Sequence, residues 1–452
     1  MSELPPGWEW TTIGDLLAPL EDGRIIHQGW SPKCETYPAA HDAWGVLKTT
    51  AIQPGSFHAE HNKALPSRLD PRPGIEVQSG DHLLTCAGPR ARCGVACLVK
   101  STRPRLMMSG KMYRFRVNEA HVSAKYLDAY LQSARAWLDI DVMKTGGSDS
   151  GLNLTQARFR ELTVPLAPRD EQERIVAAIE EHLSRLDAAD SILTSAEEGV
   201  AVLAKAGVRQ LFESRPWLWK TLGEIAEIRG GVTKDSKSQS DPSFVEVPYL
   251  RVANVQRGRL DLSDVTTIRV HPDKANTLRL EPGDVLLNEG GDRDKLGRGW
   301  VWEGQVADCI HQNHVFRARL NDDFDPYFVS THANTWGQAW FEEHGRQTTN
   351  LASINLGTLK QLPVPAPPRS EQEAIVAELK ASSEAQKRLL ASSDHAHSRA
   401  RSLRRSILAA AFSGQLVPQD SDDEPAWVLL DRIRAERAAA APTKRTRKVK
   451  AS

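Results

Sequence analysis

Cys309, His311 and His314 have the residue types of a zinc site, because thiolate and imidazole groups are ligands that zinc prefers. Such a site needs complementary ligands, and no CxxC or HxxxH pair lies near these three residues. Cys93 and Cys97 have the same weakness. We therefore expect these side chains to pack or to hydrogen-bond within strands, and the sequence predicts no metal site.

The sequence also offers no catalytic motif. Residues 229–234 come closest to a phosphate-binding loop but lack the GxxxxGK[ST] spacing. Residues 325–328 resemble the (N/D)PPY loop of amino-methyltransferases, but one proline is missing and a helix N-terminus explains the pattern. Residues 235–237 fit the D-x-K half of a nuclease site, a pattern short enough to arise by chance. No dinucleotide fingerprint, HExxH or GxSxG occurs, so we predict no catalytic residues and a protein that is not an enzyme.

Cationic side chains offer a different chemistry, the binding of nucleic acid. Between Asp81 and Glu119 the chain has no acidic residue, and aromatic residues lie among its cations. Such a segment suits a surface that faces phosphates, and a solvated face of strands and loops is the alternative. The cations are Arg90, Arg92, Lys100, Arg103, Arg105, Lys111, Arg114 and Arg116.

The bulk composition narrows the class of protein. A chain of 452 residues exceeds what one hydrophobic core usually supports, which predicts two or three domains. The formal net charge of zero argues against indiscriminate coating of polyanions. Five cysteines without a CxxC pair, no signal-peptide pattern in residues 1–6 and no membrane-length apolar run predict a cytoplasmic protein with no membrane span.

One block of sequence occurs twice, about 200 residues apart, and a period this long predicts two copies of one domain-sized unit. Weaker sequence similarity extends the repeat upstream, where Trp8 and Gly14 correspond to Trp217 and Gly223. The two copies can be related by a pseudo-two-fold axis, as in a homodimer. The block comprises Pro165, Pro168, Arg169, Glu171, Gln172, Glu173, Ile175, Val176 and Ala177, which recur as Pro365, Pro368, Arg369, Glu371, Gln372, Glu373, Ile375, Val376 and Ala377.

Each copy begins with a region of short β-type runs, turns and helices. Residues 249–255, 284–287 and 314–319 are expected strands, residues 124–140 are an expected helix, and Pro326 suits the first turn of another. The predicted fold class is α+β, with two similar α/β domains separated by two long antiparallel, coiled-coil-like helices and pseudo-two-fold symmetric.

A long helix is expected after each of two proline-rich stops, at residues 164–168 and 364–368. Asp170 and Ser370 suit the N-cap, and a glutamate three residues later would complete a capping box. About forty residues without an internal proline then give a rod of roughly 60 Å. Heptad-like apolar spacing predicts that the two helices bury their stripes against each other as a spacer, and surface helices packed on their own domains are the alternative.

The chain beyond Gly414, which supplies a helix stop, holds a short expected helix at residues 427–440 and a basic run at residues 444–450. The basic run could touch a phosphate backbone, and a solvated tail is the alternative. The predicted division is therefore a first domain at 1–168, a spacer helix at 169–213, a second domain at 214–368, a spacer helix at 369–415 and a C-terminal segment at 416–452.

These motifs together resemble the specificity subunit of Type I restriction-modification systems. The resemblance rests on the P-x-x-P-R-x-E-Q-E-x-I-V-A helix entry, which occurs twice, and on the Trp-x-Trp pairs at Trp8 and Trp217. It also rests on residues 283–287 and 311–314 in the second domain and on the helix exit at residues 404–418. It covers nearly the whole chain.

The resemblance implies that each α+β region is a target recognition domain that reads one half of a split sequence in double-stranded DNA. It implies that the helices fix the spacing of the half-sites and dock two methyltransferase subunits, to which restriction subunits add. The chain itself would hold no cofactor, since S-adenosylmethionine, ATP and magnesium would belong to those partners. A scaffold that organises partner helices without selecting DNA is the alternative function.

Base reading needs Arg or Lys against guanine and Asn or Gln against adenine. Equivalent positions in the two domains suit backbone anchoring and non-equivalent ones suit base reading, although strand arginines such as Arg114 could equally be structural. The candidate DNA contacts are Arg90, Arg92, Lys111, Arg114, Arg251, Arg257, Arg293, Lys295, Arg298, Gln312 and Asn313. The spacer and docking candidates are Glu171, Gln172, Ile175, Ile179, Leu186, Leu193, Glu371, Gln372, Ile375, Leu379, Leu389 and Leu403.

Overall fold

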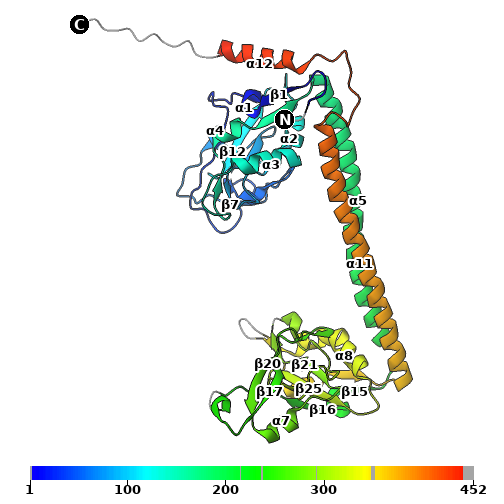
Figure 1. The fold of residues 1–452 in the computed structure, drawn as a ribbon. Helices are drawn as coiled ribbons and strands as arrows, with labels where there is room; N and C mark the ends of the chain where they lie inside the picture. Colours follow the sequence, from blue (N-terminus) through cyan, green and yellow to red (C-terminus); the bar gives the residue numbers. More distant parts are fainter. Residues whose placement is uncertain (1–2, 214, 236–237, 292, 348–351, 441–452) are drawn as a thin grey trace, which may run out of the picture. The chain divides into compact units, whose positions relative to one another are not determined.

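The computed structural model describes residues 3–213, 215–235, 238–291, 293–347 and 352–440. Residues 236–237 of the nuclease-like pattern and the basic run at 444–450 lie outside the described residues. The chain divides into two compact units (Figure 1): unit 1 comprises Met1–Ser191 and Ala396–Ser452, and unit 2 comprises Ile192–His395. We call the α+β part of unit 1, up to residue 168, head 1, and that of unit 2, from residue 215 to 368, head 2.

The main sheet of head 1 is antiparallel, with the order β10-β8-β12-β2 and with β3 also paired to β12. Five of the six side chains of the central strand β12 are buried, so it forms the middle of the core. The strands are β2 (Leu17–Ala18), β3 (His27–Gln28), β8 (His82–Thr85), β10 (Ala96–Leu98) and β12 (Met112–Val117).

Smaller sheets complete head 1, and one of them joins the start of the head to its end. β1 (Glu9–Thr12) pairs antiparallel with β14 (Thr163–Leu166), directly before the long helix. The other sheets comprise β11-β4-β7, β5-β6 and β13-β9. Their strands are β4 (Gly45–Leu47), β5 (Ile52–Gln53), β6 (Ser56–Phe57), β7 (Asn62–Ala64), β9 (Ala87–Gly88), β11 (Leu106–Met107) and β13 (Leu152–Asn153).

The prediction of one helix over residues 124–140 is wrong, because the structure has two. The Ser133 side chain accepts a hydrogen bond from the Ala136 N–H (3.1 Å) and caps a second helix, so the first ends before it. The helices of head 1 are α1 (Ile13–Leu16), α2 (Ala124–Leu131), α3 (Ala134–Met143) and α4 (Gln156–Arg160), with short 3₁₀ turns at Thr49–Ala51 and Pro73–Ile75.

Head 2 repeats this arrangement, with a main sheet of order β16-β25-β21-β23 and a second sheet of order β20-β17-β24. The predicted strands at 284–287 and 314–319 are confirmed within one residue. The predicted strand at 249–255 is interrupted, because the Asn254 side chain accepts from the Arg251 N–H (2.8 Å) and closes a turn. The strands of these two sheets are β16 (Ala226–Gly230), β17 (Val245–Leu250), β20 (Thr266–Val270), β21 (Val285–Asn288), β23 (Gly299–Val301), β24 (Ile310–His311) and β25 (Val315–Leu320).

Short pairs and helices fill the rest of head 2, and Pro326 begins α8 as expected. The remaining strands are β15 (Trp219–Thr221), β18 (Val255–Gln256), β19 (Arg259–Leu260), β22 (Gly290–Gly291), β26 (Arg346–Gln347), β27 (Ala352–Ser353) and β28 (Pro363–Pro365). The helices are α6 (Leu222–Ile225), α7 (Pro272–Leu278), α8 (Pro326–Asn334), α9 (Trp336–His344) and α10 (Leu356–Lys360), with 3₁₀ turns at Ser238–Ser240 and Arg293–Lys295.

Two long helices follow the heads, and with them the predicted fold class is confirmed. They are α5 (Arg169–Glu213, 45 residues) and α11 (Arg369–Ala411, 43 residues). Both begin directly after a proline, so Asp170 and Ser370 lie inside the first turn and the predicted N-cap at these residues is wrong. The first turn of each helix starts two residues earlier than the capping-box pattern suggested, and in α5 Arg169 pairs with Glu173 instead (3.0 Å).

Within unit 1, the beginning of α5 packs antiparallel against the end of α11. An ion pair joins Asp187 to Arg404, and a hydrogen bond joins Asp190 to the His397 ring (2.5 Å), so the partner number falls as the number on α5 rises. Within unit 2, the end of α5 packs against the beginning of α11, where Phe212 and Ile375 share one buried cluster. Each unit therefore contains its own antiparallel helix contact.

The last helix, α12 (Ala426–Ala440), packs on head 1 and confirms the predicted helix at residues 427–440. Its first amide, on Ala426, donates to the Gly7 carbonyl (2.8 Å), and Leu430 and Ile433 enter the core around Ile13. Unit 1 is thus closed by segments from both ends of the described chain. Among the described residues, no helix combines the length and the apolar character that a membrane crossing requires.

Candidate nucleic-acid interface

One buried glutamine in each unit joins the head to the helix that follows it. The Gln172 side-chain oxygen accepts from the Ser123 N–H (2.9 Å), and its amide donates to the carbonyl five residues earlier (2.9 Å). Gln372 accepts from the Asp325 N–H (2.8 Å) and also donates to the carbonyl five residues earlier (2.9 Å). Both glutamines are 0% exposed. The glutamine of the repeated motif therefore fixes the junction between head and helix twice, in the same way.

Aromatic contacts support the same junction. The ring of Phe412, next to the end of α11, lies edge-on to Tyr126 and Tyr130 of head 1, with centroids 5.2 and 5.1 Å apart. In unit 2, Phe212 lies edge-on to His332, at 4.9 Å. Burial lowers the pKa of His332 to about 4, so this ring is neutral and packs as an aromatic residue. Each head is therefore packed against the helix pair as well as hydrogen-bonded to it.

Trp8 and Glu171 form a contact in unit 1 that the sequence reasoning missed. The indole Nε1–H donates to the buried Glu171 carboxylate (2.9 Å). Burial raises the pKa of Glu171, and the hydrogen bond from Trp8 opposes that shift. In unit 2 the equivalent Glu371 pairs with Arg215 instead. The sequence does contain a feature that indicates this contact: Trp-x-Trp is repeated at the start of each copy, and a buried tryptophan needs a partner for its N–H.

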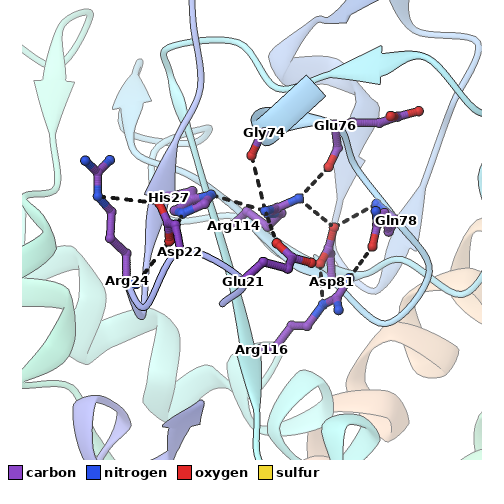
Figure 2. A network of polar contacts seen from close by, with 10 residues as sticks. All are labelled: Glu21, Asp22, Arg24, His27, Gly74, Glu76, Gln78, Asp81, Arg114 and Arg116. Atoms are coloured by element: carbon purple, nitrogen blue, oxygen red, sulfur yellow. Dashed lines mark hydrogen bonds and ion pairs between the residues drawn. The ribbon is translucent and has the colours of Figure 1, made fainter. Parts of the chain in front are cut away.

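A buried charge network crosses the main sheet of head 1 (Figure 2). Arg114, in β12, is 2% exposed and donates to the carbonyls of Glu76 and Gly74. The carboxylate of Asp81 lies 3.7 Å from Arg114 and 2.7 Å from Arg116. Burial raises the pKa of Asp81, and the two guanidinium groups oppose that shift. The network thus attaches the loop at residues 74–78 to the sheet.

His27 links this network to the surface of head 1. Its Nδ1 lies 3.1 Å from the Arg114 guanidinium, and its Nε2 lies 2.8 Å from the Asp22 carboxylate (Figure 2). Because a guanidinium group can only donate, Nδ1 accepts and the ring proton is on Nε2, which donates to Asp22. This hydrogen bond lowers the pKa of Asp22.

Head 2 contains the same network at equivalent positions. Arg317, in β25, is 2% exposed and donates to the carbonyls of Thr277 and Arg279, both at 3.3 Å. Arg319 donates to the buried Asp284 (2.8 Å). Because Arg114 and its counterpart are buried and hydrogen-bonded in both heads, their positions favour the structural role that the sequence reasoning left open.

Two further candidates in head 1 are also engaged with the protein. Arg90 is exposed but forms ion pairs with Asp141 (2.7 Å) and Asp149 (3.0 Å). Arg92 donates to backbone carbonyls of the loop at residues 49–52 and to the Gln53 side chain (3.1 Å). These arginines close loops onto the head, and only Lys111 among the head 1 candidates is exposed without an ion pair among the described residues.

Most head 2 candidates likewise contact their own head. Arg251 pairs with Asp264 (2.8 Å), and Arg293 donates to the Glu342 carbonyl (3.2 Å). Arg257 donates to a carbonyl at the end of α8. The other candidates, which are partly buried, are Lys295, Arg298, Gln312 and Asn313.

Three candidates from different heads occupy equivalent turns. Gln312 and Asn313 lie in the turn between β24 and β25, and Lys111 lies in the turn that precedes β12. The backbone confirms the equivalence, because the Cys86 N–H donates to the Lys111 carbonyl (2.8 Å) and the Glu289 N–H donates to the His314 carbonyl (2.9 Å). The structure therefore places all three candidates in one turn of the repeated fold, in which Lys111 corresponds to His314, and Gln312 and Asn313 correspond to Ser109 and Gly110.

The helix candidates divide into buried and exposed sets. In unit 1, Ile175 and Ile179 are 0% and 4% exposed and pack with residues of α11. In unit 2, Ile375 is 4% exposed, whereas Leu389 on α11 is 46% exposed. Leu403 is 51% exposed, so the expected apolar stripe is only partly covered. The partly buried candidates are Leu186, Leu193, Glu371 and Leu379.

The three residues considered together for zinc, Cys309, His311 and His314, lie in strands of head 2 or next to them. Cys309 is buried, and His311 in β24 is hydrogen-bonded through Nδ1 to the Val315 carbonyl (2.6 Å). Burial lowers the pKa of His311 to about 4. In the part of the chain that the structure describes, no group of three or more His, Cys, Asp or Glu side chains could hold a metal ion.

Two similar α+β heads, each joined to a long helix by a buried glutamine, define a duplicated two-head, two-helix class of protein. A family model described as the Type I restriction modification DNA specificity domain matches residues 215–391. This match comprises head 2 and the first part of α11, and relatives that are similar in sequence are specificity subunits of Type I restriction enzymes.

Relatives in this family are similar over different parts of their length. The chain is 39% identical over 205 residues to the Type I restriction enzyme EcoEI specificity subunit of Escherichia coli, which covers 45% of this chain and 34% of that protein. It is 26% identical over 321 residues to the EcoKI specificity subunit of Escherichia coli strain K12, and this match covers 66% of this chain and 68% of that protein. The first match thus spans about a third of its relative.

Solved structures show that the fold is also shared. One, described as the structural basis underlying complex assembly and conformational transition of the type I R-M system, has a TM-score of 0.67 at 19% identity and covers 92% of this chain and all of that chain. The HsdS subunit from Thermoanaerobacter tengcongensis has a TM-score of 0.53 at 19% identity, and the match covers 92% of this chain and 98% of that chain.

Proposed function

We propose that this chain is the DNA-recognition subunit of a Type I restriction-modification complex. Each head reads one half of a two-part target in double-stranded DNA, and the long helices dock two methyltransferase subunits, to which restriction subunits add. The chain itself is non-catalytic and cytoplasmic, and adenine methylation, S-adenosylmethionine, ATP and magnesium belong to its partners. The division into recognition domains at 1–168 and 214–368 and spacer helices at 169–213 and 369–415 is part of this proposal.

The repeated junction between head and helix carries the proposal. Gln172 and Gln372 hold their heads by equivalent buried hydrogen bonds, so each head is a rigid continuation of the helix pair in its own unit. A split target needs readers whose position relative to the spacer does not drift, because half-sites on a duplex are separated by fixed multiples of the helical repeat. A flexible linker would blur that spacing.

The exposed parts of the helices support the docking part of the proposal. Leu389 and Leu403 are 46% and 51% exposed, and exposed leucines on a long helix are suited to the apolar face of a partner helix. Glu171 and Gln172 act within unit 1 itself, so the proposed docking surface consists of exposed helix positions rather than of the buried entry motif.

Methylation mapping tests the proposed function. The chain is co-expressed with its methyltransferase partner in a host that lacks this modification, and methyladenine is mapped across the genome. We expect one two-part motif with a fixed gap. Methylation without such a motif, or complexes that form with no DNA preference in an electrophoretic assay, would support the scaffold alternative instead. DNA cleavage or methylation by the chain alone would refute the non-catalytic assignment.

A further inference from the structure

A glycine in head 1 lets a loop approach the turn at residues 109–111 very closely. A Cβ atom on Gly29 would lie 2.2 Å from the Ser109 carbonyl oxygen, which no side chain tolerates. The next residue, Trp30, donates its N–H to the Met108 carbonyl (3.0 Å), and the Gly110 N–H donates to the Ser31 hydroxyl (3.0 Å). The turn is therefore held from one side by a loop that only glycine can bring so near.

Head 2 has the same junction at the turn of residues 312–314. A Cβ atom on Gly231 would lie 1.9 Å from the His311 carbonyl oxygen. Val232 donates its N–H to that carbonyl (2.8 Å), and the Asn313 N–H donates to the Val232 carbonyl (2.9 Å). The two heads thus share one backbone frame around equivalent turns.

The side chains on this shared frame differ between the heads. Head 1 presents Ser109, Gly110 and the exposed Lys111, and head 2 presents Gln312, Asn313 and His314 at the matching positions. The side-chain carboxamide of Gln312 has no hydrogen-bond partner in the described part of the chain, and the side-chain amide of Asn313 lies 3.3 Å from the His314 ring. Equal backbones with unequal hydrogen-bonding groups are what two readers of different sequences require.

We infer that these two turns are the base-reading elements of the heads, an inference that rests on the proposed DNA-binding function. The turn of head 2 reads an A·T pair, because a carboxamide such as that of Gln312 can bond adenine N6 and N7 together. The turn of head 1 reads a guanine, because the ammonium group of Lys111 can donate to guanine O6 and N7.

The surroundings of the head 1 turn suit contact with DNA. The guanidinium of Arg72 lies 4.0 Å from the centroid of the Trp30 ring, directly beside the turn, and this arginine is exposed. An exposed guanidinium on an aromatic ring can face a phosphate while the turn reaches the groove. Arg90 and Arg92, in contrast, are already bonded to their own head.

Substitution in one head at a time tests the inference. Gln312→Ala and Lys111→Ala are each co-expressed with the methyltransferase partner, and methylation of the target is compared with methylation of every single-base variant of it. Gln361→Ala, at an exposed residue after α10, and Arg135→Ala, at an exposed residue of α3, are the matched controls. Circular dichroism and co-purification with the partner verify that each variant folds and assembles.

We expect Gln312→Ala to reduce discrimination about 10-fold at one position of one half-site, and Lys111→Ala to do the same in the other half-site only. The controls leave both half-sites unchanged. Discrimination that survives both substitutions, or changes in the same half-site for both, refutes the inference while the proposed function stands. A wild-type chain without a two-part motif refutes the proposed function and the inference with it.

Discussion

Replacing the helix-entry glutamines Gln172 and Gln372 by leucine measures how much the junctions between heads and helices contribute to the free energy of unfolding. Gln372 makes three side-chain hydrogen bonds, to the Asp325 N–H and to the carbonyls of Asp323 and Pro367. Gln172 makes two, to the Ser123 N–H and to the carbonyl five residues earlier. Leucine has a similar volume, so the substitution removes polar contacts and creates little cavity.

The expected loss in the free energy of unfolding follows from the number of hydrogen bonds removed. A net contribution of about 1 kcal/mol for each buried hydrogen bond gives a loss of about 3 kcal/mol for Gln372→Leu and about 2 kcal/mol for Gln172→Leu. The carbonyl and amide groups left without a partner raise both values further. This increase is larger for Gln372→Leu, which leaves three groups without their partner instead of two, so the two losses should differ by at least about 1 kcal/mol.

Urea unfolding followed by circular dichroism gives the free energies, and hydrogen exchange with mass spectrometry localises the change. Amides around residue 325 in head 2 should lose protection in Gln372→Leu, and those around residue 123 in head 1 should lose it in Gln172→Leu. Gln361→Leu, at an exposed position, is the control and should change stability by less than about 0.5 kcal/mol. Losses no larger than that of the control, or a larger loss in Gln172→Leu than in Gln372→Leu, would refute the reasoning.

Three further outcomes are expected. Arg114→Met leaves Asp81 buried with one partner fewer and should cost about 3 kcal/mol in urea unfolding, and an unchanged midpoint would contradict the network. Gly231→Ala should cost more than about 2 kcal/mol, whereas Gly74→Ala, which has open space around its Cβ, should cost less than about 0.5; equal effects would contradict the close approach. Burial lowers the pKa of His332 from 6.5 to about 4, so stability is fully present above pH 6.5 and is lost by about 1.4 kcal/mol per unit as the pH falls toward 4. His332→Gln should flatten that slope in acid titrations, and an unchanged slope would show that the ring does not resist protonation.

The duplication was readable from the sequence because it depends on local patterns. The helix entry combines a proline stop, a glutamine and an apolar stripe within thirteen residues, and the structure begins both helices there. Only the cap was misplaced, since the proline at position 168 or 368 already precedes the first turn. Propensity locates such boundaries to within one or two residues, and the hydrogen bonds of Gln172 with head 1 could not be read from the pattern.

The buried arginines were not readable, because their burial depends on partners far along the chain. Arg114 and Arg116 lie two residues apart in β12, so the sequence gives no reason to distinguish them. Their side chains are nevertheless 3% and 32% exposed. Arginine is rarely buried without a charge partner, and that partner, Asp81, comes from another strand connection. A basic segment free of acidic residues therefore suggested one surface, whereas the fold divides it between the core and the outside.

The repeat itself separates framework from recognition when the two heads are compared position by position. Groups that recur with the same chemistry, such as Gln172 with Gln372 and Arg114 with Arg317, are buried and hydrogen-bonded to their own unit. Groups that occupy one frame with different chemistry are found at the surface turns. Under the proposed function, a subunit that reads two unlike half-sites must keep its framework equal and its readers unequal, so this division favours the turns over the equivalent cations Arg90 and Arg293 as the proposed base-reading elements.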